Sequence, residues 1–439
     1  MAAYEDPDER PLDVNRGSVV DDPDERPLNT TTRMRSLADK DNFFRAEAEL
    51  VLDEQRRQKA EKIKDLGSPI ALTGIALAIR VQGQHVWIAE NTSIVRKVDL
   101  ETGGTVQRLR GHTAPVTALT FFDKISGSGD GKTVISGSWD KSINIWDTET
   151  NKLISSTPAH SDFVKTLLVI PSCNLLVSGS SDKIVRFWDL TNYTSGNPLP
   201  SIGSISAHTR PVECLDARSM SADSAILYTA DTMGVIKVWK LTKELNVSAP
   251  RWKATLQDEL NHHRTGVVEI IYGDGFVWTA SSDETAQVVQ HPLVPQDPPV
   301  RPTPPLTHPK AVKAILPLSV TPLGEPYLLT GSGDIIRAYD ISAPDEPELL
   351  GETDAHWHDV TALKLWMRQT TVDGKTLVEP WVISTSLDRT IRKWRLSDLL
   401  KPPPPKPVEE KPVPVEMPEA YKMSEEEERE LAELMDDDD

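Results

Sequence analysis

Six histidines recur along the chain at nearly even intervals, and acidic or hydroxyl residues follow each of them. The intervals are 48, 48, 55, 45 and 48 residues, for His112, His160, His208, His263, His308 and His356. Imidazoles and carboxylates bind zinc or act as general acids and bases, but only where they converge on one site. Even spacing instead predicts one histidine in each copy of a repeated unit. We therefore expect no catalytic, metal-binding or cofactor-binding set.

A glycine-rich stretch that ends in Gly131-Lys132-Thr133 is the second candidate for chemistry. In a phosphate-binding loop, another glycine precedes this triplet by a fixed spacing and a helix follows it. Ser126 occupies the position of that glycine. The runs Thr133–Ser136 and Ser142–Trp146 are rich in β-branched residues, which favour strands. We therefore predict a turn between strands and no nucleotide site.

The elements that would position these residues come from an internal repeat. Three segments share one order of residues: "GHTAPVTALTFF…VISGSWDKSINIWD", "AHSDFVKTLLVI…LVSGSSDKIVRFWD" and "AHWHDVTALKLW…VISTSLDRTIRKW". They begin at Gly111, Ala159 and Ala355. Weaker copies begin at Ala207, His263 and Thr307, and an opening copy without the histidine begins at Gly74. Seven units of this length, each with several short strands, are typical of propeller blades.

The spacing from Gly-His to Trp-Asp resembles that of the WD-repeat family, over about residues 67–397. The resemblance implies an all-β fold, a seven-bladed β-propeller, to which we add an N-terminal α-helix and disordered acidic and proline-rich ends. In such a blade, the histidine, a serine or threonine, the aspartate and the tryptophan can join in one hydrogen-bonded chain, because buried polar groups need partners. The complete sets are His112, Ser136, Asp140 and Trp146 in blade two, His160, Ser178, Asp182 and Trp188 in blade three, and His356, Ser384, Asp388 and Trp394 in blade seven.

Four blades depart from this pattern. Blade one has Val98 in place of the tryptophan and no His–Asp pair, and blade four has Met233 at the aspartate position. Blade five has Val289 in place of the tryptophan, and blade six reaches Tyr339 one residue early. We expect apolar packing, rather than the polar chain, to hold these blades, with lower local stability.

Blade seven needs an outer strand, because the proline run follows it at once. In this family that strand usually comes from the other end of the chain, and closure removes exposed sheet edges. The segment "LGSPIAL", residues 66–72, is the first candidate, and the longer N-terminal arm is the second.

Two faces of the propeller are expected to differ. The loops before each first strand and the turns between second and third strands share one face, called the top face. Large side chains in these loops are the predicted partner-binding residues, since aromatic and arginine side chains anchor interfaces: Trp139, Phe163, Arg210, Trp357 and Leu387. The other face receives longer insertions, among them residues 219–224 and 368–380, which we predict as surface loops. These insertions mark either a second docking surface or tolerated variation.

The ends of the chain complete the predicted domain organisation. Residues 1–35 form a disordered acidic arm, 36–66 a helix, 67–397 the propeller, 398–423 a proline-rich linker and 424–439 a short acidic helix. The first helix either packs on the propeller or forms a coiled coil with a partner. The last presents an apolar face for a partner groove, formed by Leu431, Leu434 and Met435.

Composition limits the partners. The net charge is −19, and residues 401–439 hold 14 acids and 5 bases, a balance of −9. No basic stripe suited to duplex nucleic acid is present. The two cysteines cannot build a disulfide framework, and no signal peptide or membrane span is recognised. We expect a protein of the nucleus, the cytoplasm or both, with protein partners; its oligomeric state stays open.

These observations favour a non-catalytic scaffold or adaptor in a larger complex. The alternative is an acidic escort for a basic client such as a ribosomal protein or histone, in ribosome biogenesis or chromatin. A ubiquitin-ligase receptor would show Trp-Asp-x-Arg, but Trp146-Asp147 is followed by Thr148-Glu149. An enzyme is the least favoured class, because propeller enzymes place catalytic groups around the central channel and we find no such set.

Overall fold

The computed structural model describes residues 51–122, 132–244, 251–292, 303–343, 345–372 and 375–401. The predicted acidic arm, the start of the predicted N-terminal helix, and the tail motif of Leu431, Leu434 and Met435 lie outside these residues. The chain divides into two compact units, residues 1–64 and 65–439. In the first, residues 51–62 are helical, so the helix ends four residues before the predicted end. Whether it pairs with a partner stays a prediction.

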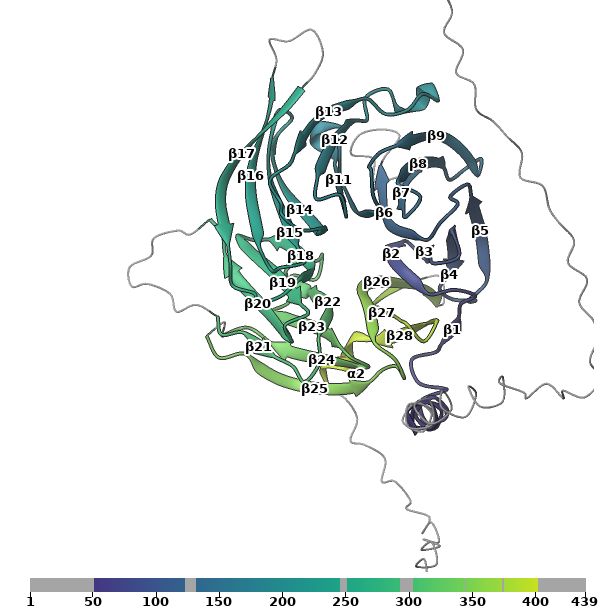
Figure 1. Cartoon of the computed structure of the whole chain (residues 1–439). Coiled ribbons are helices and arrows are strands. Elements are labelled where there is room, and N and C mark those ends of the chain that lie inside the picture. The colour runs from purple at the N-terminus through teal and green to yellow at the C-terminus, as the bar shows by residue number, and fades with distance from the viewer. Residues whose placement is uncertain are drawn as a thin grey trace, which may run out of the picture. The chain divides into compact units, whose positions relative to one another are not determined.

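The second unit contains seven four-stranded antiparallel sheets around a central axis (Figure 1). Blade one comprises β2 (Ala76–Gln82), β3 (His85–Glu90), β4 (Ile94–Asp99) and β5 (Thr105–Arg110). Blade two comprises β6 (Val116–Phe122), β7 (Thr133–Ser138), β8 (Ser142–Asp147) and β9 (Lys152–Pro158). Blade three comprises β10 (Val164–Ile170), β11 (Leu175–Ser180), β12 (Val185–Asp189) and β13 (Ser201–Ile205). Blade four comprises β14 (Val212–Ser221), β15 (Ser224–Asp231), β16 (Ile236–Glu244) and β17 (Arg251–Leu260).

The remaining blades follow the same order. Blade five comprises β18 (Val267–Gly273), β19 (Phe276–Ser281), β20 (Thr285–Gln290) and β21 (Leu306–Thr307). Blade six comprises β22 (Val312–Pro317), β23 (Tyr327–Ser332), β24 (Ile335–Asp340) and β25 (Glu348–Asp354). Blade seven comprises β26 (Val360–Val372), β27 (Lys375–Ser386), β28 (Thr390–Arg395) and β1 (Ile70–Ala71). Short helices connect or follow strands: η1 (Pro171–Cys173), η2 (Tyr193–Ser195), η3 (Leu318–Val320) and α2 (Leu396–Leu400).

The core lies between neighbouring sheets. Every residue of β7 and β11 is buried, because each of these second strands has both faces covered by neighbouring blades, whereas the outer strand β5 is mostly exposed. Thr133 begins strand β7, so no helix follows Gly131-Lys132-Thr133 as a phosphate-binding loop would require. None of the helices in the described residues is long and apolar enough to cross a bilayer.

Blade seven is closed by the first candidate segment. Strand β1 pairs with β28 in the register Ile70↔Ile391 and Ala71↔Thr390, and the Leu72 amide donates to the Arg389 carbonyl at 2.8 Å. Gly67 lies in the left-handed region with φ +66°, and a side chain there would collide with the Trp394 ring. Only glycine satisfies both conditions. Gly67 therefore allows the chain to pass close to Trp394 at the closing seam.

The prediction of surface loops at residues 219–224 and 368–380 is wrong. Strands β14 and β15 stay paired to Ser221↔Ser224, and β26 and β27 stay paired to Val372↔Lys375. β-branched residues such as Thr370 and Val378 favour the extended backbone and continue the sheets as projecting hairpins. Helix α2 likewise extends over residues 398–400, which we had predicted as the start of the linker.

Closure predicts a stability effect. Ile70 is buried in a cluster that includes Val98, Trp366 and Ile391. We expect Ile70→Ala to lower the free energy of unfolding by about 2–3 kcal/mol, through lost burial and a cavity at the seam. Val106→Ala on β5, where the side chain is exposed, should change it by less than about 0.5 kcal/mol. Urea titration followed by tryptophan fluorescence measures both; equal values would show that β1 contributes nothing to closure.

Candidate protein-interaction surface

Hydrogen-bonded chains fix the top-face loops of blades two, three and seven. In blade two, His112 Nδ1–H donates to Asp140 Oδ2 at 2.8 Å, and the Ser136 hydroxyl donates to His112 Nε2 at 2.8 Å. The Trp146 indole N–H donates to Ser136 Oγ at 2.8 Å. Asp140 also accepts the Thr113 amide. The chain thereby ties the loop before the first strand to the turn after the second.

The other two complete sets have the same geometry. In blade three the distances are 2.9 Å for His160–Asp182, 2.7 Å for His160–Ser178 and 2.8 Å for Trp188–Ser178. In blade seven they are 2.8 Å for His356–Asp388, 2.8 Å for His356–Ser384 and 2.9 Å for Trp394–Ser384. Burial lowers the pKa of His160, which favours the neutral imidazole that the chain requires.

Blade four corrects the sequence prediction. Its aspartate is Asp231, two residues before Met233, and His208 Nδ1–H donates to it at 3.1 Å. Thr229 supplies the hydroxyl at 2.7 Å from His208, and the Trp239 indole donates to Thr229 at 3.0 Å. Expecting apolar packing alone was therefore wrong here. Asp231 lies at the end of β15 and contacts the histidine of its blade, as the repeat aspartates do in blades two, three and seven, although it comes two residues before the aligned position.

Blade five keeps three of the four groups, so the expectation of apolar packing alone was wrong there too. His263 lies 3.1 Å from Asp283 and 2.7 Å from Thr279, and Val289 replaces the indole. Blade one packs Val98 in an apolar cluster, as expected, and adds an ion pair between the buried Glu90 and Arg96 that the sequence analysis did not predict. A carboxylate and a guanidinium satisfy each other as the histidine chain does elsewhere.

Blade six lacks the carboxylate. The turn after β23 is one residue shorter than in blade two, with Ser332 paired directly to Ile335, and Asp334 accepts Lys310 instead. His308 Nδ1–H therefore donates to the Leu306 carbonyl at 3.0 Å. Its Nε2 accepts from Thr330 at 2.9 Å and lies 3.2 Å from the Tyr339 hydroxyl.

The central channel contains charged groups that the sequence analysis did not find. Lys364 Nζ lies 2.7 Å from Glu269 Oε1, and these residues come from β26 and β18, in blades that are not neighbours, so they meet across the channel. Asp216 accepts the Tyr272 amide at 2.6 Å, and burial raises its pKa to about 6. Arg80 carries an opposing charge near both carboxylates.

The charged groups of the channel are bonded to one another or to backbone amides. The second oxygen of Glu269 accepts the Ile315 amide at 2.9 Å, and the second oxygen of Asp216 accepts the Ala217 amide at 2.8 Å. The cluster therefore ties inner strands of several blades together. No group of three or more His, Cys, Asp or Glu side chains in the described residues could hold a metal ion.

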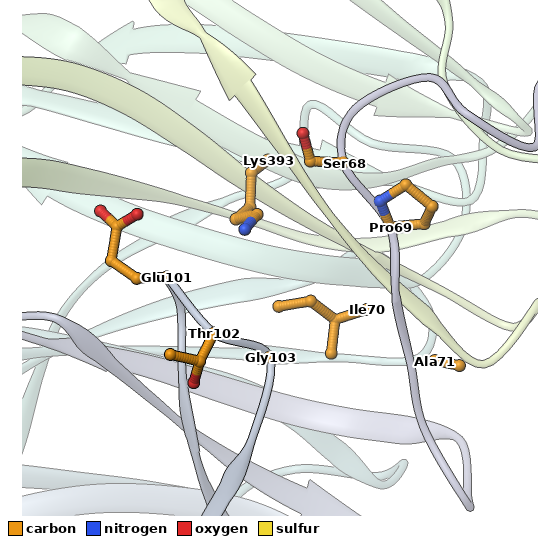
Figure 2. A pocket seen from close by; sticks show the side chains of 8 residues that line it. All are labelled: Ser68, Pro69, Ile70, Ala71, Glu101, Thr102, Gly103 and Lys393. Atoms are coloured by element: carbon orange, nitrogen blue, oxygen red, sulfur yellow. The ribbon is translucent and has the colours of Figure 1, made fainter.

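A cavity of about 420 Å³ lies at the closing seam. Figure 2 shows Glu101, Ile70 and Lys393 around this hollow. Lys393 Nζ donates to the Leu100 carbonyl at 2.6 Å, and Glu101 accepts two hydrogen bonds from Arg368 at 2.7 and 3.0 Å. Its charged groups are already engaged by the protein, so the cavity belongs to the seam and offers no convergent set for a ligand.

The predicted partner-binding residues lie in three places in the top-face loops. Trp139 and Phe163, from blades two and three, stack with ring centroids 5.0 Å apart and planes 19° apart, although they are 40% and 38% exposed. Arg210 is exposed in blade four. Trp357 and Leu387 are half-buried in blade seven. The structure thus brings the first two together and leaves the last two on a separate blade.

Sequence reasoning missed three exposed residues in the top-face turns of blades two to four. Lys141 and Lys183 occupy the turns of blades two and three, and Met233 in blade four is 52% exposed. The lysines follow the repeat aspartates directly, a position that could have been read from the aligned copies. Met233 was instead noted only as a replacement for the repeat aspartate.

Comparison with known proteins agrees with this architecture. A family model described as "WD domain, G-beta repeat" matches residues 103–147 and 151–189. These two segments are therefore similar to WD repeats, and they lie in blades one to three of the propeller. An uncharacterized WD repeat-containing protein of Schizosaccharomyces pombe is 26% identical over 367 residues, which cover 81% of this chain and 88% of that protein.

Two further relatives match over shorter stretches. The COMPASS component SWD3 of Saccharomyces cerevisiae is 30% identical over 36% of this chain and 48% of its own length. The small ribosomal subunit protein RACK1y of Oryza sativa subsp. japonica is 34% identical over 20% of this chain and 25% of its own length. The names of both relatives describe components of larger assemblies.

The shifted aspartate of blade four can be tested directly. We expect Asp231→Ala to lower the free energy of unfolding by about 2–3 kcal/mol, because the buried His208 Nδ1–H loses its acceptor. Met233→Ala, at the position that the repeat alignment favoured, should change it by less than about 0.5 kcal/mol. Urea titration distinguishes the two. A larger loss of stability in Met233→Ala than in Asp231→Ala would show that the aligned position, and not Asp231, stabilises the blade.

Blade six should respond to acid. Burial, with Arg337 nearby, lowers the pKa of His308 from its usual 6.5 to about 4. Between these values the unfolded chain binds more protons than the folded one, so stability falls as the pH falls below 6.5. Between about pH 7 and about pH 5, the free energy of unfolding of the His308→Gln variant should therefore fall by about 2 kcal/mol less than that of the wild type.

Tyr339→Phe is the control for this measurement, because it removes a hydroxyl beside the ring and keeps the imidazole. Its absolute stability changes but its pH dependence should match the wild type. Urea titrations across the pH range measure all three proteins. Full acid sensitivity in the glutamine variant would show that His308 is not the responsible group.

Proposed function

We propose that this protein is a non-catalytic scaffold or adaptor subunit of a larger intracellular complex, and that it binds partner proteins through the top face of its propeller. One observation carries the proposal: the Trp139–Phe163 stack stays exposed on loops that hydrogen-bonded chains hold in place. Exposed aromatic pairs on rigid loops are typical anchors of protein interfaces. The membership of SWD3 and RACK1y in assemblies, as their names state, supports the same class.

Terminal linear motifs extend this proposal. The apolar face of Leu431, Leu434 and Met435, on an acidic segment after the proline-rich linker, is proposed as a second contact that increases avidity. These residues lie outside those that the structure describes, so their role rests on the sequence pattern.

The alternative, an acidic escort for a basic client, is favoured by the net charge of −19 and the balance of −9 in residues 401–439. Complementary charge speeds association and makes it sensitive to salt. A client of this kind should be lost when residues 402–439 are deleted or when salt is raised, whereas a top-face partner should survive the deletion.

The experiment compares partner lists captured by the full chain from a cell lysate. We expect Trp139→Ala/Phe163→Ala to reduce a defined subset of partners at least about fivefold, because two central anchors are removed. The matched control is Val106→Ala/Leu153→Ala, which truncates exposed apolar side chains on the outer strands β5 and β9. Quantitative mass spectrometry measures the loss. Equal lists for both variants would overturn the top-face assignment.

A further inference from the structure

We propose that the top face of blades two to four binds an acidic segment of a partner protein that also carries aromatic or aliphatic side chains. The inference rests on the proposed scaffold function and names the chemistry of its partner. The surface, here called the arc, comprises Trp139, Lys141, Phe163, Lys183, Arg210 and Met233. All six are exposed, and they come from consecutive blades.

The apolar part of the arc can bury a partner side chain. Trp139 and Phe163 present a stacked pair at the junction of blades two and three, and Met233 lies on the next blade. The pair is held from below, because the Trp139 amide donates to the Pro115 carbonyl and the Ser181 amide to the Phe163 carbonyl, both at 3.0 Å. Aromatic rings and a thioether contact apolar groups of varied shape at little cost in conformational entropy.

The cations of the arc are unpaired. Among the described residues, no carboxylate lies within ion-pair distance of Lys141, Lys183 or Arg210. Both lysines hold left-handed turn positions, with φ +71° and +70°. The Lys141 carbonyl accepts the Ala159 and His160 amides at 2.9 and 3.2 Å. Its backbone is therefore fixed while its ammonium stays free for a partner.

The acids beneath the arc are already occupied. Asp140, Asp182 and Asp231 have side chains no more than 12% exposed, and each accepts a hydrogen bond from its histidine. Asp162, which is half-buried, accepts the Phe163 amide at 2.8 Å. In these loops and turns the most exposed charged side chains are consequently the cations Lys141, Lys183 and Arg210.

Blades five to seven do not offer the same chemistry. Their loops mix both signs: Glu284 is exposed, Lys310 lies 3.1 Å from Asp334, and Lys313 lies 2.6 Å from Asp359. Blade seven does carry an exposed cation, Arg389, which holds the same left-handed turn position with φ +62° and has no ion pair among the described residues, but the aromatic residue of its loop, Trp357, is half-buried. Only the arc therefore combines such cations with an exposed aromatic pair in the described residues of the top face.

Charge complementarity decides the partner. With a net charge of −19, the chain repels acidic proteins except near exposed cations, and among these the cations of the arc share their face with the exposed Trp139–Phe163 pair, so an acidic segment with apolar side chains would favour the arc. Cations beside aromatic rings also suit single-stranded nucleic acid. Three cations above buried carboxylates neutralise too few phosphates for that ligand, so the observations favour a peptide.

The test selects ligands without assuming their sequence. A random peptide library displayed on phage is panned against the full wild-type chain, and binders that Trp139→Ala/Phe163→Ala loses are kept as arc-dependent. We expect these peptides to be net acidic with aromatic or aliphatic residues. Lys141→Glu/Lys183→Glu/Arg210→Glu should weaken them by about tenfold or more, and raising the salt should weaken them further.

The control is Lys152→Glu/Lys240→Glu/Lys253→Glu, which changes the net charge equally on exposed positions of β9, β16 and β17. It should retain the selected peptides within about twofold, since those lysines lie on the strands away from the top loops. Folding of every variant is checked by its urea midpoint.

The outcomes separate two failures. Arc-dependent peptides that are neutral or basic would overturn the acidic-partner inference and leave the scaffold function standing. A fluorescent single-stranded oligonucleotide that binds the arc more tightly than the peptides would also overturn it. The absence of any arc-dependent binder, together with unchanged partner lists in the lysate experiment, would overturn both proposals.

Discussion

The structure depends on a neutral imidazole that donates to a buried carboxylate and accepts from a hydroxyl. In blade two this joins His112 to Asp140 and Ser136, and it locks one loop to one turn of the same sheet. Each partner would be costly to bury alone, so the groups are stable only as a set. The repeated set gives most blades the same top-face geometry, although different segments of the chain form them.

Contacts that cross blades complete the ring. Strand β1 supplies the outer edge of blade seven, and the Lys364–Glu269 pair crosses the channel between blades seven and five. Both contacts join segments that are far apart in the chain, so their loop-closure entropy is recovered only when the whole ring forms. Closure also removes the free edge of β28, which would otherwise invite pairing with another chain.

The fixed loops of the top face determine how the exposed residues are presented to a partner. The rings of Trp139 and Phe163 stack across a blade junction because both loops are held from beneath. Binding there orders little backbone, which reduces the entropic cost of association. The same surface is positive at its outermost layer on a negatively charged protein, so attraction to a partner is local while repulsion is general.

The repeat in the sequence by itself determined the number of units and the residues of three complete hydrogen-bonded sets, because these follow from local periodicity and spacing. The family resemblance, rather than spacing, indicated that the closing strand comes from the other end of the chain, and the structure chose residues 70–71 from the two candidate segments. Tertiary structure alone decided which acid reaches His208, because a side chain two residues from the aligned position, Asp231, meets the same imidazole once β15 is in place. It also decided that residues 368–380 extend a hairpin, that Glu269 meets Lys364 and that Trp139 meets Phe163. Such pairings depend on how distant strands are brought together in three dimensions, which no spacing along a single repeat encodes.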